Sequence, residues 1–107
     1  MHEARPGRRA VVAASLGDLH GPVGGKVTLP LRLFWCPEGR VWDLDNPEEI
    51  EAMYERVLGQ AIRVEELAEW LDGERLVAVW ADLYLPRGVR RAWEERHPAL
   101  RAAVAVA

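Results

Sequence analysis

The stretch that decides the fold is residues 46–61, which read NPEEIEAMYERVLGQA. Asn46 is a favourable N-cap, Pro47 suits the first helical position, and Glu49 stands where it would close a capping box with Asn46. Apolar residues then recur at the three- and four-residue spacing of a helix with one buried face, namely Ile50, Met53, Tyr54, Val57, Leu58 and Ala61. The sequence therefore predicts an amphipathic helix whose charged residues face outward.

A β-hairpin is predicted immediately before this helix. In residues 27–34, apolar residues alternate with others in the period-two pattern of a half-buried strand, and Pro30 places that strand at a sheet edge or marks a bulge. Residues 36–39 fit a tight turn, with Pro at the second position and Gly at the fourth. Residues 40–44 would then form the second strand. The Gly-rich residues 17–25 are expected to be an irregular connection.

Shorter helices are predicted after residue 61. They cover residues 64–71, residues 74–83, and a stretch starting near Pro86 that the His97-Pro98 step interrupts, because the residue before proline is driven out of the helical region. Their expected core residues are Leu76, Val79, Trp80, Leu83, Val89, Trp93 and Leu100. The predicted fold class is thus α+β, a single small domain with one antiparallel β-hairpin followed by about four short helices.

Size and composition favour one globular domain. The chain has 107 residues, of which 50% are hydrophobic and 29% charged, so it can form one core. We expect a basic N-terminal tail at residues 1–9, the domain at residues 10–101 and an apolar C-terminal tail at residues 102–107. No apolar run reaches bilayer length and no signal peptide is recognisable, which predicts a cytoplasmic protein that does not enter membranes. The lone Cys36 excludes an internal disulfide.

Candidate catalytic residues are few. Asp43 and Asp45 lie two apart and could share a divalent cation, but a third carboxylate and a Gly-rich phosphate-binding turn are missing, so Asp45 is better explained as part of a helix start. The histidines His2, His20 and His97 have no partner at the spacing of a helical metal site. We therefore expect a protein that is not an enzyme and that binds no metal and no cofactor.

The tryptophans admit two interpretations. Large aromatic residues fill cores or anchor interfaces, and in a domain of this size most are expected in the core. The chain has five of them, namely Trp35, Trp42, Trp70, Trp80 and Trp93.

Charge is distributed by segment. Residues 1–41 carry six basic and three acidic side chains, residues 42–85 three basic and twelve acidic, and residues 86–107 five basic and two acidic. The acidic middle segment suits a basic protein partner, and its outward-facing carboxylates are the candidate contacts. These are Glu51, Glu55 and Glu69.

A second candidate surface is basic. Arg87, Arg90 and Arg91 fall in the first turns of a predicted helix, where positive charge opposes the helix dipole. Intrahelical pairs with Glu94 and Glu95, four residues on, would satisfy two of them. The alternative is that these arginines contact an anionic partner or the phosphates of RNA.

Several motifs resemble a known family. They are DLHGP at residues 18–22, LPLRLFW at residues 29–35, WDLD at residues 42–45 and LPRGVRRAWE at residues 85–94. Over roughly residues 15–100 the chain is similar to a family of small proteins of high-GC bacteria, associated with genes that lie beside AbiEii-type nucleotidyltransferase toxins. The resemblance implies an antitoxin or accessory role, and it assigns no site residue.

Two functional hypotheses follow. The first is a non-enzymatic partner-binding protein, an antitoxin or accessory protein that neutralises a nucleotidyltransferase-type toxin through an acidic helical surface. A nucleotidyltransferase binds triphosphate and RNA, so its working face is expected to be basic. The alternative is a small nucleic-acid-binding transcriptional regulator that uses Arg5, Arg8 and Arg9 of the basic tail together with the helix at residues 87–91.

Overall fold

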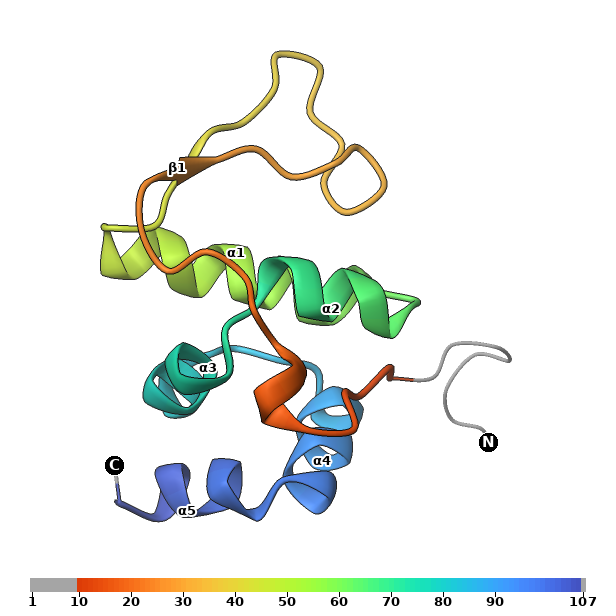
Figure 1. The fold of residues 1–107 in the computed structure, drawn as a ribbon, viewed down its shortest axis with the longest axis vertical. Coiled ribbons are helices and arrows are strands. Elements are labelled where there is room, and N and C mark those ends of the chain that lie inside the picture. The colour runs from red at the N-terminus through yellow and green to blue at the C-terminus, as the bar shows by residue number, and fades with distance from the viewer. Residues whose placement is uncertain (1–9, 107) are drawn as a thin grey trace.

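The computed structural model describes residues 10–106, so the predicted basic tail at residues 1–9 lies outside it (Figure 1). Along the described chain the elements are η1 (Leu16–Asp18), β1 (Lys26–Val27), β2 (Trp42–Asp43), α1 (Pro47–Gln60), α2 (Val64–Trp70), α3 (Gly73–Val79), η2 (Trp80–Asp82), α4 (Arg87–Arg96) and α5 (Pro98–Val106). In Figure 1 the hairpin lies at one end, α1 and α2 cross the middle, and α3, α4 and α5 lie at the other end. The predicted α+β class is confirmed.

Helix α1 forms as its sequence predicts. Its N-cap is Asn46, whose Oδ1 accepts a hydrogen bond from the Glu48 amide at 2.9 Å, and the whole predicted apolar stripe is buried. The predicted capping box between Asn46 and Glu49 is wrong, because the Glu49 carboxylate accepts a hydrogen bond from the Asp43 amide at 2.8 Å instead. The Glu49 carboxylate therefore joins the end of β2 to the first turn of α1 and does not cap the helix.

The two strands pair antiparallel but are much shorter than predicted. The register joins Lys26 to Asp43 and Val27 to Trp42. The expected strands at residues 27–34 and 40–44 are therefore wrong in length. The physical reason for the first is Pro30, which has no amide hydrogen to continue the ladder.

After β1 the chain turns instead of extending. The Leu33 and Phe34 amides both donate to the Pro30 carbonyl, at 2.9 and 3.0 Å. As a result Leu29 and Leu33 are buried while Leu31 is 66% exposed, so the apolar period here is four and not two. The predicted turn at residues 36–39 is confirmed: the Gly39 amide donates to the Cys36 carbonyl, and Gly39 has a φ of +73°, which glycine adopts without strain.

The C-terminal half contains the rest of the core. Trp80, Trp93 and Leu100 are fully buried, and the predicted break before Pro98 separates α4 from α5. That break makes five α-helices in residues 10–106, and residues 102–106, expected as an apolar tail, lie in α5. The buried His97 Nε2 lies 2.8 Å from the Ala13 carbonyl oxygen, which ties the α4–α5 junction to the start of the described chain.

Two close contacts join α1 and the N-terminal segment to the α2–α3 junction. The Tyr54 hydroxyl accepts from the Asp72 amide at 2.9 Å, and burial raises the pKa of Tyr54 to about 12. The segment before β1 runs along the same junction, where the Gly21 amide donates to the Leu71 carbonyl at 2.7 Å. A Cβ at Gly21 would lie 2.3 Å from the Trp70 carbonyl carbon, so only glycine fits there.

Candidate functional site

The hairpin loop, residues 28–41, exposes large apolar side chains. Leu31, Trp35 and Val41 are 66%, 71% and 56% exposed, and we call these three residues the apolar loop surface. The other four tryptophans are buried or half-buried, as expected for most of them. An exposed tryptophan on a loop that carries other exposed apolar side chains is typical of a protein-binding surface.

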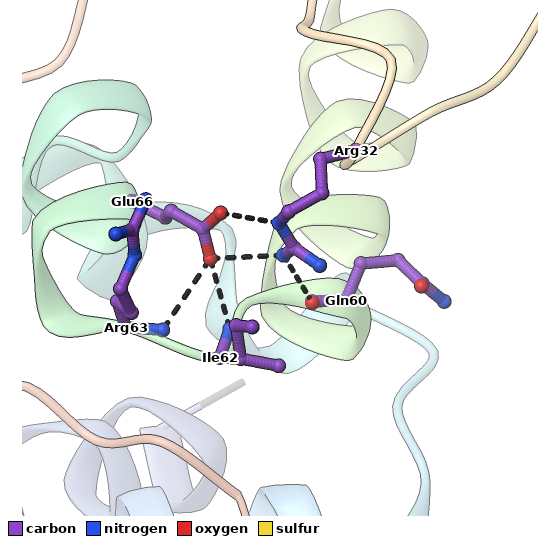
Figure 2. A network of polar contacts seen from close by, with 5 residues as sticks. All are labelled: Arg32, Gln60, Ile62, Arg63 and Glu66. Carbon is purple, nitrogen blue, oxygen red and sulfur yellow. Dashed lines mark hydrogen bonds and ion pairs between the residues drawn. The ribbon is translucent and has the colours of Figure 1, made fainter.

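An ion pair fixes the loop to the helices (Figure 2). The Arg32 guanidinium donates to both oxygens of Glu66, from Nε at 2.6 Å and from a terminal nitrogen at 2.9 Å, and it also donates to the Gln60 carbonyl at 2.7 Å. A bidentate pair of this kind fixes orientation as well as distance. The hairpin loop is thereby attached at Arg32 to the α1–α2 junction.

The Glu66 carboxylate completes the network from the other side. It is buried and accepts from the backbone amides of Ile62 and Arg63, at 2.8 and 3.3 Å. Hydrogen bonding from Arg32 lowers the pKa of Glu66 below its ordinary value of 4.5, although burial acts in the opposite direction. Sequence reasoning missed this pair, since 34 residues separate its members.

The structure brings together two of the three predicted acidic residues. Burial and then the charges of Asp82, Glu55 and Glu48 raise the pKa of Glu51, and we call these four residues the acidic group. Glu55 also accepts from the Tyr84 amide at 2.7 Å, which is a structural role. Glu69 is exposed on α2 and is not among the charges that act on Glu51.

The predicted basic residues on α4 divide into two kinds. Arg87 and Arg91 are exposed. Arg90 is half-buried: it donates to the Leu83 carbonyl at 2.5 Å, pairs with Glu94 at 3.4 Å as predicted, and stacks over the Trp80 ring. In the described part of the chain no ion pair joins Arg91 to Glu95. Arg90 therefore holds α4 against η2, and the basic face reduces to the other two arginines.

The aspartates that suggested a cation site belong to the turn before α1. Asp43 Oδ1 accepts from the Asp45 amide at 3.1 Å. Within residues 10–106 no three histidine, cysteine or carboxylate side chains gather as metal ligands would. Over the same residues, no helix combines the length and the apolar character that crossing a bilayer requires.

Comparisons of this chain with protein-family models, with curated proteins and with solved structures returned no match. Function therefore has to follow from the chemistry of the described residues.

Replacing Glu66 by Gln should lower the free energy of unfolding by about 1.5 to 3 kcal/mol at neutral pH, because a charged hydrogen-bond partner is lost. Since the folded pKa of Glu66 lies below 4.5, its contribution is fully present above that pH and disappears as the pH falls through the folded value. Urea unfolding across pH should show that the free energies of unfolding of wild type and Glu66→Gln approach each other in acid. The exposed Glu69→Gln on the same helix is the control, and an equal loss there would refute the role of the pair.

Glu51→Gln should raise stability at neutral pH. The pKa of Glu51 is raised in the folded chain, so its ionised form costs stability above pH 4.5 and costs nothing well below it. Thermal unfolding should therefore show a gain for the variant at neutral pH that vanishes in acid. A larger gain for Glu69→Gln, which lies outside the acidic group, would contradict the assignment of that group.

Proposed function

We propose that this chain is a non-enzymatic protein-binding domain that contacts its partner through the hairpin loop. The observation that carries this proposal is the 71% exposure of Trp35. Tryptophan is the residue most enriched among binding hot spots, and leaving it in water forfeits the free energy of burying a large apolar side chain. Leu31 and Val41 are further exposed apolar side chains on the same loop.

The attachment of the loop supports a role in binding. A loop that is disordered before binding loses conformational entropy when it binds, whereas a pre-organised one loses little. Here the bidentate Arg32–Glu66 pair holds one arm, the Cys36–Gly39 turn closes the tip, and buried Leu33 anchors the loop to the core. Trp35 therefore projects from a segment whose backbone is held on both sides.

The antitoxin form of this function rests on the resemblance, which implies a nucleotidyltransferase toxin as the partner. The acidic group supports it, because four carboxylates on α1 and η2 suit a basic phosphate-binding surface and speed association with it. Of these, Glu48 is exposed and Glu51 half-buried, and neither makes an ion pair within residues 10–106. In this proposal the acidic group guides the partner and the apolar loop surface holds it.

Nucleic-acid binding is the second candidate function, and the exposure of Arg87 and Arg91 on α4 favours it. Two observations weigh against it. Arg90 already donates to the Trp80 and Leu83 carbonyls and pairs with Glu94, and Glu94 and Glu95 on the same helix repel phosphate.

Trp35→Ser should weaken binding of the partner more than about tenfold, the cost expected for truncating a hot-spot tryptophan. The measurement is affinity for the protein captured from the native host by the tagged wild-type chain and then purified. Val104→Ser, which removes an exposed apolar residue from α5, is the matched control and should leave affinity unchanged. Unchanged affinity of a folded Trp35→Ser variant would refute the proposal.

Two charge-reversal pairs separate the candidate functions. Glu48→Lys with Glu51→Lys should slow association with a basic partner and weaken its salt dependence, while Arg87→Glu with Arg91→Glu should change little. Nucleic-acid binding would reverse this order and fall steeply with salt. Association rates measured at two salt concentrations distinguish the two functions. Glu55 and Arg90 are not mutated, because both also stabilise the fold through hydrogen bonds to the backbone.

A further inference from the structure

A groove lies beneath the hairpin loop, between the loop and the outer face of α1. Its volume is about 530 Å³, and its walls include Phe34, Arg40 and Trp42 from the hairpin and Arg56 and Gly59 from α1. We call it the arginine–aromatic groove. Neither arginine stood out in the sequence, because 16 positions separate them and only the fold brings them to one groove.

The four side chains of the groove pack as a connected series. Arg40 Cζ lies 3.8 Å from the centre of the Trp42 ring, and Arg56 Cζ lies 4.7 Å from that of Phe34. The two rings meet edge to face with their centres 5.3 Å apart. Stacking on a ring orients a guanidinium and leaves the N–H groups at its rim free to donate. The groove therefore presents two pre-oriented cations.

The two cations are weakly paired with anions. Over residues 10–106, no carboxylate lies within 4.0 Å of Arg56, and the one that reaches Arg40 is Glu49, at 4.0 Å. Glu49 is already engaged by the Asp43 amide at 2.8 Å. The Arg40 side chain is 41% exposed. Guanidinium groups held in this way are suited to an incoming anion with two oxygens.

We propose that the arginine–aromatic groove binds carboxylate side chains from an extended acidic segment of the protein partner. The inference rests on the proposed function, because the groove and the apolar loop surface belong to one segment. Phe34, Arg40 and Trp42 line the groove, while their chain neighbours Trp35 and Val41 are exposed. A partner could therefore place an acidic segment in the groove while another part of it covers the apolar loop surface.

The surrounding charge favours a peptide over a nucleic acid. Glu55, a member of the acidic group, lines the same groove. Glu49 and the other members on α1, Glu48 and Glu51, add negative charge to the same helix. A nucleic acid carries a phosphate at every nucleotide and would be repelled along this path. Separate carboxylates, spaced by apolar residues, need to satisfy only the two arginines.

Gly59 offers a variant that fills the groove without removing a charge. A Cβ at this position meets no atom within 4 Å, and leucine is a better helix former than glycine, so Gly59→Leu should fold at least as well as wild type. Gly88 on α4 is equally open and lies outside the groove, which makes Gly88→Leu the matched control. Arg56→Gln tests the charge directly, and Arg56→Lys keeps the charge without the planar group.

The test is fluorescence anisotropy with a labelled peptide of Glu-Leu-Gly repeats, its Gln-Leu-Gly counterpart, and a labelled oligothymidylate. The acidic peptide should bind more tightly than its glutamine counterpart. Arg56→Gln and Gly59→Leu should each weaken that binding about tenfold, the cost of losing charge-assisted hydrogen bonds, with Arg56→Lys in between and Gly88→Leu unchanged.

Three results would overturn the inference: equal or undetectable binding of the two peptides, binding that Gly59→Leu leaves intact, or oligothymidylate binding more tightly than the acidic peptide with the same dependence on Arg56. The protein-binding proposal is judged separately by Trp35→Ser and the captured partner. If that variant loses the partner while Gly59→Leu keeps it, the groove inference fails and the protein-binding function stands.

Discussion

The hairpin loop and the corner between α1 and α2 both depend on the bidentate pair between Arg32 and Glu66. The hairpin has only two paired residues in each strand, so backbone hydrogen bonds between the strands do little to place the loop that joins them. Its position comes from buried Leu29 and Leu33 and from the guanidinium that reaches the α1–α2 junction. The pair also satisfies backbone groups between α1 and α2, so one carboxylate orders both the loop and the helical corner beneath it.

Local signals in the sequence predict the helices well. Helix α1 has its cap, its proline and a complete apolar stripe within 16 residues, and the step before Pro98 divides the last two helices for a reason confined to one dipeptide. The predicted length of the strands is wrong because alternation alone does not distinguish a paired strand from a turn that buries every fourth residue. Pro30 is the residue that indicates this difference. It has no amide hydrogen for a strand ladder, and its carbonyl accepts the hydrogen bonds of the Leu33 and Phe34 amides that form the turn.

The candidate site was predicted less well, because its residues act through partners distant in the chain. Glu55 accepts a hydrogen bond from the Tyr84 amide, and Arg90 donates one to the Leu83 carbonyl. Two residues predicted as partner contacts from their charge therefore also stabilise the fold. No periodicity or motif signals such contacts. Trp35 was visible in the sequence as one of five tryptophans, but its exposure follows from the fold alone, as does the stacking that orients Arg40 and Arg56.

The two-sided character of the hairpin loop makes it sensitive to chain length. On the arm that returns to β2, Arg40 and Trp42 line the groove while Val41 between them faces outward. A single residue inserted between Val41 and Trp42, whose pairing with Val27 fixes its position, would exchange the faces of the two residues before it, turning the cation outward and the apolar side chain inward. Substitutions can alter each surface by itself, whereas an insertion or deletion here changes both at once. The end of the loop next to β2 is thus open to variation in residue type and restricted in length.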